Sequence, residues 1–405
     1  SWGELGNQNT SNLYPFYEIL PVKSNSGNWL VNGGKTNTAD IPSLVSTLLT
    51  WERVRSFNVG FDFGAFSNRL TGSFDYFVRK TVDMVGPAPQ LPLVLGIAPA
   101  IVNNADMKSY GFEIELSWRD RIGEVDYGVK FNLADAQQKV VKYPNTTNAF
   151  SDWYAGKMSG EIWGYTSLGI AKTDEEMKEH LASLPNGGQN QLGNKWGAGD
   201  IMYADINGDG KVDGGKGTLA DPGDQRIIGN STPRYNFGLV LDASYKGFDV
   251  SIFFQGVGKR DYAPIVGTNG AVFWGAVNNI WQSMAMEEHF DYFRPEGHPM
   301  GANLNGYYPR PDFTSNKNHQ VQTRYLQDAS YIRLKNLQIG YTLPKQWINK
   351  LHINRCRVYV SGDNLWTGTS LASMFDPETL AAGDWGSGKT YPLSKVISFG
   401  LNVNF

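Results

Sequence analysis

An acidic loop carries the side-chain pattern in this sequence that most suggests metal chemistry. Within 205–213, acidic and amide residues occupy positions one, three, five and nine of a calcium-binding loop, and a lysine carbonyl would serve at position seven. Position twelve is Lys216 instead of the bidentate glutamate of an EF-hand. The pattern predicts a structural calcium ion that pins the loop; the alternative is an Asx-rich turn without metal. The candidate ligands are Asp205, Asn207, Asp209, Lys211 and Asp213.

No catalytic pattern accompanies this loop. The histidines form neither an HExxH motif nor a close pair. The segment 256–259 lacks the spacing and the following helix of a phosphate-binding loop. Cys356 is the single cysteine and lies in an apolar alternating segment, so we interpret it as a packed or lipid-facing thiol. We therefore predict a protein that is not an enzyme.

Aromatic residues in the long polar segments form a second set of candidate binding residues. A flat ring flanked by Asn, Asp and Arg suits stacking against a sugar, and a bound peptide would use the same rings. Packing of the loops on themselves, or burial against a partner protein, is an equally weighted alternative for each ring. These candidate substrate contacts are Trp153, Tyr154, Trp163, Trp274, Trp281, Tyr307 and Tyr308.

The elements that position these residues are amphipathic strands. Ile397, Phe399, Leu401, Val403 and Phe405 alternate with small polar residues up to the end of the chain. Successive side chains of a strand point to opposite faces, so one face is apolar and the other polar. The same alternation recurs in segments that pair as hairpins, and the predicted strands are 57–65, 70–78, 112–118, 125–133, 235–242, 248–255, 337–343, 356–360 and 397–405.

Connection lengths separate a soluble sandwich from a membrane barrel. Short turns alternate with long connections, which we place at 83–106, 138–233, 259–323 and 367–394. Outer-membrane barrels have short periplasmic turns and long extracellular loops, whereas a sandwich has no reason to sort its loops in this way. With periplasmic short turns, Phe405 ends in the periplasm. The apolar face would then meet lipid, and Asp, Glu, Asn and Gly would line a wet lumen.

Composition excludes several other classes. The net charge of −3 gives no basic footprint for nucleic acid. No apolar run approaches the roughly 20 residues that a membrane helix needs. Aromatic residues near strand ends suit the headgroup level of a membrane, although core packing is the alternative for each: Trp51, Trp118, Trp347 and Trp366.

Nine strands from residue 57 onward, with a tenth expected near 1–9, are few for loops of this size. The chain begins at Ser1 without a signal peptide. We therefore expect residues 1–405 to be a portion of one larger antiparallel transmembrane β-barrel, with further strands upstream.

Motifs along nearly the whole chain resemble the SusC/RagA family. They are SWGELGN at 1–7, DINGDGKVD at 205–213, DQRIIG at 224–229, PRYNFG at 233–238, YKGFD at 245–249, FFQGVG at 253–258, YIRLKNL at 331–337, GYTLP at 340–344 and SGDNL at 361–365. The resemblance implies the C-terminal part of a TonB-dependent outer-membrane transporter of Bacteroidota, with a barrel of about 22 strands. It also implies that Asp221 or Asp224 takes a calcium-ligand role, because 214–220 resembles an insertion.

Members of that family import oligosaccharides or peptides together with a SusD-like surface lipoprotein. They carry a plug domain and a TonB-contacting segment upstream, and we expect both to be absent from these residues. The resemblance thus implies a nutrient importer that works with the TonB complex. A surface adhesin or substrate-binding barrel without transport is the alternative, which loop length alone would allow.

Overall fold

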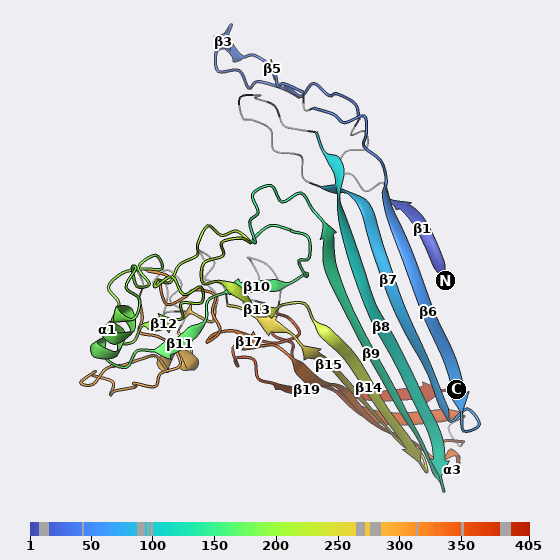
Figure 1. Cartoon of the computed structure of the whole chain (residues 1–405). Helices are drawn as coiled ribbons and strands as arrows, with labels where there is room; N and C mark the ends of the chain where they lie inside the picture. Colours follow the sequence, from blue (N-terminus) through green and yellow to red (C-terminus); the bar gives the residue numbers. More distant parts are fainter. Residues whose placement is uncertain are drawn as a thin grey trace. The chain divides into compact units, whose positions relative to one another are not determined.

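The structure, a computed structural model, describes residues 1–7, 16–42, 44–86, 94, 97, 100–264, 272–275, 285–312, 315–349, 352–380 and 390–405. Ten strands form one antiparallel sheet in the order β1-β6-β7-β8-β9-β14-β15-β18-β19-β20 (Figure 1). Their bounds are β1 Trp2–Asn7, β6 Glu52–Ala65, β7 Leu70–Gly86, β8 Val102–Ile122, β9 Val125–Lys142, β14 Arg234–Tyr245, β15 Phe248–Lys259, β18 Tyr331–Thr342, β19 Arg355–Thr369 and β20 Val396–Asn404. The all-β prediction and each of the ten predicted strands are confirmed.

The remaining elements are short and lie in the connections. In the described ranges they are β2 Val22–Lys23, β3 Leu30–Val31, β4 Gly34–Lys35, β5 Thr38–Ala39, β10 Glu161–Gly164, β11 Ser167–Ile170, α1 Asp174–Ala182, β12 Ile201–Tyr203, β13 Arg226–Asn230, β16 Asp261–Tyr262, η3 Glu287–Phe290, β17 Gln327–Asp328 and α3 Lys345–Ile348. None of these helices is long and apolar enough to cross a membrane.

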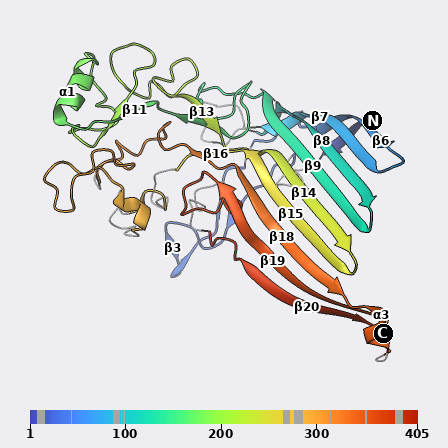
Figure 2. The ribbon, with the colours of Figure 1, turned by 90° about the horizontal axis from the view of Figure 1, so that it is seen from below.

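The chain divides into two compact units. One comprises Ser1–Val59, Tyr76–Gly111 and Gln137–Ser159, and the other comprises Gly60–Asp75, Phe112–Ala136 and Gly160–Phe405. Figure 2 shows β14, β15, β18, β19 and β20 of the second unit side by side, as their printed registers require. The described residues of the long connections of this unit share one buried cluster and are here called the loop domain (the described parts of 160–230, 260–330 and 371–380).

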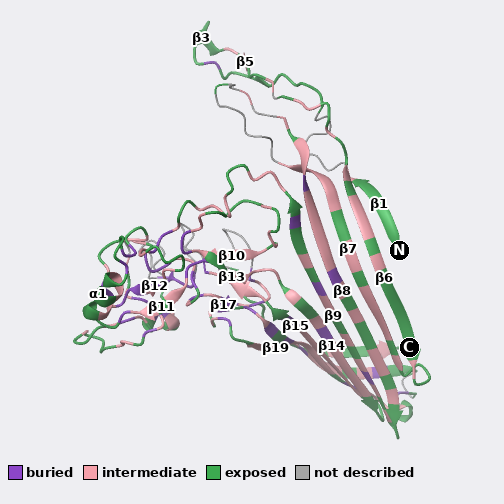
Figure 3. Ribbon diagram, viewed as in Figure 1, coloured by how far each residue is buried: buried purple, intermediate pink, exposed green. Residues whose placement is uncertain are grey.

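Exposure of the apolar face distinguishes this sheet from a soluble sandwich. Phe399 is 85% exposed, Leu401 65% and Phe61 60%. A sandwich would bury these side chains against a second sheet, whereas a membrane barrel turns them toward lipid. Figure 3 shows the same contrast, because buried residues gather in the loop domain around β11 and β12 while the strands are mostly half-buried or exposed.

Strands β7 and β8 run further than predicted, so the expected connection at 83–106 is shorter than the alternation suggested. Polar residues continue the strands because their side chains bond to the neighbouring backbone. The Asn103 amide donates to the Asp83 carbonyl at 2.6 Å, and the Asp83 amide donates to the Asp106 carboxylate at 2.9 Å. The alternation of apolar residues therefore stops before the backbone pairing of β7 with β8 ends.

Two of the short turns have left-handed backbone. Phe66, Ser67 and Asn68 between β6 and β7 have φ angles of 54°, 58° and 63°. Lys246 and Gly247 between β14 and β15 have φ angles of 47° and 91°, as a two-residue type I′ hairpin turn requires. The alternation of short turns and long connections is confirmed, with β18 and β19 joined by the intermediate segment that holds α3.

Candidate functional site

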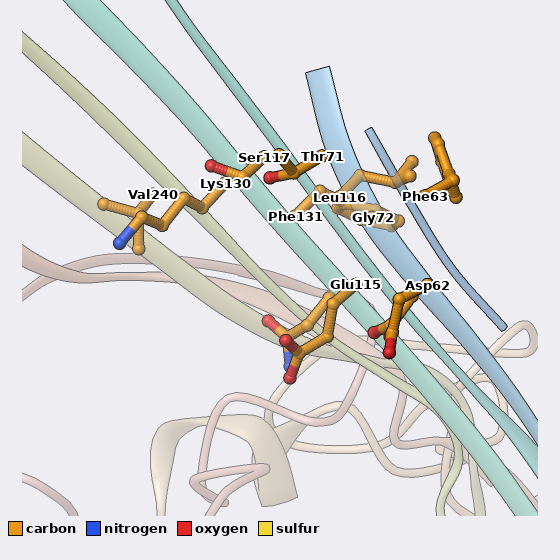
Figure 4. Close-up of a pocket in the computed structure, with 12 residues that line it drawn as sticks. Asp62, Phe63, Thr71, Gly72, Glu115, Leu116, Ser117, Lys130, Phe131 and Val240 are labelled. Atoms are coloured by element: carbon orange, nitrogen blue, oxygen red, sulfur yellow. The ribbon is translucent and has the colours of Figure 1, made fainter. Parts of the chain in front are cut away.

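The polar face of the sheet contains a hollow of about 570 Å³ in the second unit. Strands β6, β7, β8, β9 and β14 line it, and Figure 4 shows the carboxylates of Asp62 and Glu115 on the same side of these strands. Lys130 lies on the neighbouring β9. Within the described ranges the side chains of these three residues have no ion pair or hydrogen bond, so each is available to a ligand.

Glycines shape this polar face. Asp242 lies directly across from Gly128, and a Cβ added to Gly128 would sit 2.6 Å from the Asp242 Oδ2 atom. Asn132 covers its cross-strand partner Gly238 in the same way. A polar side chain next to a glycine lies across the neighbouring strand, because no Cβ there prevents it. The polar face of the sheet therefore presents hydrogen-bonding side chains that lie flat against the neighbouring strand.

The loop domain is built around an aromatic core. Phe273 contacts Trp274, Tyr308 and Tyr325 with ring centroids 5.0, 5.2 and 5.8 Å apart. Aromatic pairs in tilted and edge-to-face arrangements stabilise a core beyond simple burial. The core residues are Tyr165, Leu184, Ile201, Tyr203, Val212, Val272, Phe273, Trp274, Tyr308, Tyr325, Ala329, Leu371, Phe375 and Leu380.

Helix α1 begins at the surface of this core because its sequence satisfies the first amides. The Thr173 hydroxyl accepts the Glu176 amide at 3.1 Å, and acidic residues fill the first turn, where the helix dipole favours them. Met177 is the buried residue of the helix. The Asp174 carboxylate accepts the Ala198 amide at 2.7 Å and the His180 ring bonds to Gln189 at 3.2 Å, so polar contacts also dock the helix.

A buried ion network connects distant parts of the loop domain. The fully buried Asp200 accepts hydrogen bonds from Arg310 at 2.6 and 2.7 Å, from the Lys317 ammonium at 2.9 Å and from the Asn318 amide at 2.9 Å. The Gly197 backbone amide donates to the same carboxylate at 2.9 Å. Removal of one member would leave a buried charge unpaired. The network therefore holds two sequence-distant segments as one body.

Residues 371–380, which follow β19 and are here called the strap, are bound to strand β18 by ion pairs. Arg333 of β18 is 3% exposed and bonds to Asp376 and Glu378, each at 2.8 Å. Lys335 pairs with Glu378 at 2.6 Å. Burial alone would raise the pKa of Asp376, but the Arg333 guanidinium and two backbone amides lower it overall. Phe375 of the strap packs in the aromatic core, so the strap joins the loop domain to β18.

The acidic loop folds on its own backbone amides. The Asp205 carboxylate accepts the amides of Gly208 at 2.7 Å and Gly210 at 2.9 Å, while the Asn207 carbonyl accepts the Asp209 amide at 2.9 Å. These Asx turns bring side-chain oxygens to the inside of the loop, and oxygen donors are those that calcium prefers.

Asp224 and Asp213 close this loop. The buried Asp224 accepts amides of Ile206 at 2.7 Å and Asp213 at 2.8 Å, and burial raises its pKa despite these bonds. The Lys211 ammonium pairs with Asp213 and lowers the pKa of that carboxyl. No group of three or more His, Cys, Asp and Glu side chains converges as a metal site in the described ranges. Calcium at this loop stays a prediction.

The predicted aromatic contacts are placed in different surroundings. Trp274 is fully buried and Tyr308 is 2% exposed, so both rings serve the core of the loop domain in this conformation. Burial raises the pKa of Tyr308 well above its usual value. Tyr307 is half-buried and its hydroxyl accepts from Gln327 at 2.9 Å. These placements agree with the alternative of loop packing that the sequence left open.

The other aromatic candidates are more accessible or outside the described residues. Trp153 is 42% exposed and packs on Tyr143 with ring centroids 5.6 Å apart. The Lys157 ammonium lies 5.3 Å from the ring of Tyr154. Trp163 is half-buried in β10. Trp281 lies outside the described residues.

Several important residues carried no sequence signal. His319 is buried, and burial lowers its pKa to about 4. Asp200 and Arg333 likewise lie in segments without a motif for an ion network. Their charged partners, Arg310 and Lys317 for Asp200 and Asp376 and Glu378 for Arg333, are more than 40 residues away in the chain, so only the fold brings them together.

Comparison with known proteins agrees with this architecture. A family model described as "TonB dependent receptor-like, beta-barrel" matches residues 1–365. The chain therefore belongs to the β-barrel family of TonB-dependent receptors, which are outer-membrane proteins. The family is one of receptors and transporters rather than enzymes.

Individual relatives show which members of this family the chain is similar to. TonB-dependent receptor P3 of Formosa agariphila is 28% identical over 100% of this chain and 39% of its own length. TonB-dependent receptor SusC of Bacteroides thetaiotaomicron is 20% identical over 100% of this chain and 37% of its own length. The solved "Structure of the RagAB peptide transporter" matches 100% of this chain and 40% of that chain, with a TM-score of 0.70 and 23% identity. The predicted likeness to SusC and RagA is confirmed, and the chain spans about two fifths of these relatives.

Proposed function

We propose that this chain supplies part of the wall and the extracellular loop domain of an importer that carries a nutrient oligomer across the outer membrane. A SusD-like surface lipoprotein and the TonB complex are its proposed partners. The plug domain and the TonB contact are proposed to belong to other parts of the protein, since the described residues form the strands of one sheet and the connections between them.

The hollow, in which charged side chains stand among apolar ones such as Phe63, Leu116 and Phe131, is the observation that carries the proposal. Asp62, Glu115 and Lys130 line it with no protein partner among the described residues. Unpaired charged groups in a polar, lumen-type wall suit a hydrophilic cargo, because such a cargo exchanges water for hydrogen bonds at little cost.

A peptide is the cargo that this chemistry favours, and an oligosaccharide is the second candidate. Peptides carry amino and carboxylate groups that complement Glu115 and Lys130. A neutral glycan would depend more on aromatic platforms, and Trp274 and Tyr308 are buried in the loop core. The solved relative whose title names a peptide transporter has the same fold.

Uptake by whole cells tests this function. Cells in which the gene is deleted should fail to grow on one class of peptide as sole nitrogen source, while growth on free amino acids is normal. Cells that carry the double variant Asp62→Asn, Glu115→Gln should import basic peptides more slowly than acidic ones. Normal growth of the deletion strain on every peptide and oligosaccharide tested would contradict import.

Surface binding without transport is the competing function. An adhesin would retain labelled peptide or glycan on the cell surface but would deliver none to the periplasm. Protease treatment of intact cells separates surface-bound from imported label. Retention without internalisation would favour the adhesin.

We also propose a structural calcium ion for the acidic loop. Asp205, Asn207 and Asp209 would supply side-chain oxygens, and Lys211 its backbone carbonyl, with Asp213 or Asp224 completing the set. The Lys211 ammonium would have to leave Asp213, to which it is paired. Bound calcium would fix the loop that packs against Asn186, whose amide donates to the Asp209 carbonyl at 2.5 Å.

A further inference from the structure

The short-turn edge of the sheet carries two clusters in which a cation lies against aromatic rings of the apolar face. One is centred on Arg69, between β6 and β7, and the other on Lys246, between β14 and β15. Both belong to the second unit of the chain. We define the Arg69 cluster as Phe66, Arg69, Trp118, Asp120 and Tyr127, and the Lys246 cluster as Glu124, Tyr245, Lys246, Phe248 and Tyr341.

In the Arg69 cluster the rings form a continuous platform. Phe66 and Trp118 have ring centroids 5.8 Å apart, and the Trp118 indole donates to the Tyr127 hydroxyl at 3.2 Å. The Arg69 guanidinium carbon lies 6.0 Å from the Trp118 ring, within cation–π range. Trp118 and Tyr127 share the apolar parity of their strands, so the platform is on the face that meets lipid.

The turn before Arg69 is held in a strained conformation. A bulky residue such as Phe66 rarely adopts the left-handed region, yet its φ is 54°, and Ser67 and Asn68 follow it there. Arg69 donates to the Phe66 carbonyl through Nε at 3.0 Å, which fastens the turn. The strain keeps Phe66, which is 60% exposed, beside Trp118.

The Lys246 cluster repeats this arrangement with different residues. The Lys246 ammonium lies 5.2 Å from the Tyr245 ring. Phe248 pairs across the sheet with both Tyr245 and Tyr341, and its ring centroid is 4.4 Å from that of Tyr341. Phe248 is 57% exposed and Tyr245 44%, so this platform also faces outward.

A carboxylate accompanies each cation. The Arg69 guanidinium bonds to Asp120 at 3.0 Å, and the Lys246 ammonium bonds to Glu124 at 2.7 Å. The side chains of Lys246 and Glu124 are 60% and 61% exposed, and that of Arg69 is 50% exposed. The exposed Lys246–Glu124 pair contributes little to stability, so its hydrogen-bonding groups are free to rearrange around a ligand. Asp120 is 22% exposed and also accepts the Arg121 backbone amide at 2.8 Å, so in the Arg69 cluster the guanidinium is the more accessible member of the pair.

We propose that each cluster binds the headgroup of a zwitterionic phospholipid with a primary amine. The lipid phosphate would lie on Arg69 or Lys246, the lipid ammonium on Asp120 or Glu124, and the acyl chains along the aromatic platform. Aromatic rings prefer the headgroup level, and cations extend to it from an apolar stem. The inference rests on the outer-membrane placement of the sheet and adds specificity for one lipid class.

Charge favours this headgroup over an anionic one. The Lys246–Glu124 pair has no net charge, and Arg69 and Asp120 line one hollow together with Arg119, Arg121 and Asp126, so an anionic lipid would meet a carboxylate beside the cation at either cluster. A phosphate followed by an ammonium group complements both members of the pair. The quaternary amine of phosphatidylcholine has no N–H to donate, whereas phosphatidylethanolamine does.

Arg121 provides a matched control in the same turn as Asp120. Its side chain is 63% exposed and pairs with Asp126 at 3.7 Å, but it lies at the polar parity of β8. It donates to the Gly123 carbonyl at 3.0 Å and has no aromatic ring contact among the described residues. Loss of this cation should leave headgroup binding unchanged.

The experiment compares lipids retained by the intact receptor. The purified protein is placed in nanodiscs of phosphatidylcholine that contain either phosphatidylethanolamine or phosphatidylglycerol, and retained lipid is counted by native mass spectrometry. We expect preferential retention of phosphatidylethanolamine. Arg69→Gln and Lys246→Gln should each lower it about fivefold at the affected cluster, the change expected for loss of one cation near a membrane surface. Arg121→Gln should retain as much as the wild type.

The carboxylate variants test recognition of the lipid ammonium group separately from recognition of its phosphate. Asp120→Asn and Glu124→Gln should abolish discrimination between phosphatidylethanolamine and phosphatidylcholine while phosphate binding persists. Preference of the wild type for phosphatidylglycerol, equal retention of all lipids, or an equal loss in Arg121→Gln would overturn the proposal. If the Arg69→Gln protein fails to assemble in the membrane, the lipid retention of the Lys246→Gln and Asp120→Asn proteins tests the proposal.

Membrane fractionation of the same cells keeps the two proposals apart. A wild-type protein that is missing from the outer membrane would contradict the placement and, with it, the proposed importer. A protein that is in the outer membrane and has no headgroup preference would contradict only the lipid sites.

Discussion

The imidazole of His319 lies edge-on to the indole of Trp274, with ring centroids 4.5 Å apart and planes inclined by 70°. Neither imidazole nitrogen of His319 makes a hydrogen bond among the described residues, and the Trp274 Nε1 atom is likewise unpaired. Buried polar atoms of this kind need water or a protein partner. The contact between the two rings is therefore a weak point of an otherwise well-packed core.

Acid should loosen the loop domain through His319. Burial lowers its pKa to about 4 from an ordinary value of 6.5, so the unfolded chain binds the proton more readily. The stabilising contribution is complete above about pH 6.5 and is lost as pH falls toward 4, by about 3 kcal/mol in total. Hydrogen exchange of the loop domain at pH 7 and pH 5 measures the change. His319→Gln should remove most of the difference, and an unaltered difference would contradict this assignment.

Asp200→Asn should destabilise the loop domain strongly. The variant leaves Lys317, whose side chain is 1% exposed, without its main counter-charge, and broken buried pairs cost about 3–5 kcal/mol. Limited proteolysis of 190–200 and 310–320 should become faster. Asp40→Asn is the control, because the Lys23–Asp40 pair is exposed and contributes about 1 kcal/mol or less. Similar proteolysis of the Asp200 variant and the wild type would show that the network is dispensable.

Gly256→Ala should disturb the sheet more than Gly128→Ala. A Cβ at position 256 would collide with the Tyr331 carbonyl oxygen, which the pairing of β15 with β18 fixes in place, and would also meet the half-buried Phe237 ring. Overpacking of this kind costs about 1–3 kcal/mol. A Cβ at position 128 meets only the Asp242 carboxylate, which rotates away. Heat-modifiable migration in gels measures barrel stability, and a ranking in the opposite order would contradict the packing described.

Calcium should raise the melting temperature of the loop domain and its chelation should lower it. The response should disappear in Asp209→Ala, because the predicted ligand at position five is lost. Asp224→Ala should destabilise the loop with or without calcium, since Asp224 accepts backbone amides of the loop. Anomalous scattering that shows no ion at 205–213 in calcium-soaked crystals would refute the prediction.

Strand positions could be predicted from sequence because their physics is local. The alternation that ends at Phe405 gives β20 its two faces without reference to any other strand. Connection lengths then indicated a membrane barrel, and the exposed apolar face agrees. The pattern did not predict that β7 extends to Gly86 and that β8 begins at Val102, because polar side chains there bond to residues 20 or more positions away.

The loop domain was harder to predict because its core is assembled from distant segments. Trp274 and Tyr308 have the composition expected of ligand-stacking rings, and only the fold shows that they face each other in a core. His319 and Asp200 lie outside the quoted motifs, and the motif that contains Arg333 gives no sign of its ion pairs. The sequence indicated a headgroup-level position for Trp118 but not its contact with Arg69, since the two residues meet only when β7 and β8 pair.

The glycines opposite polar side chains on the wall have an evolutionary consequence. Gly128 and Asp242, and likewise Gly238 and Asn132, share one volume between two positions. A larger residue at either glycine is acceptable only when a smaller residue replaces its cross-strand partner or the partner's side chain turns away. Each pair should therefore behave as a single unit of substitution, with covarying columns in an alignment of related barrels, even though neither position carries a motif by itself.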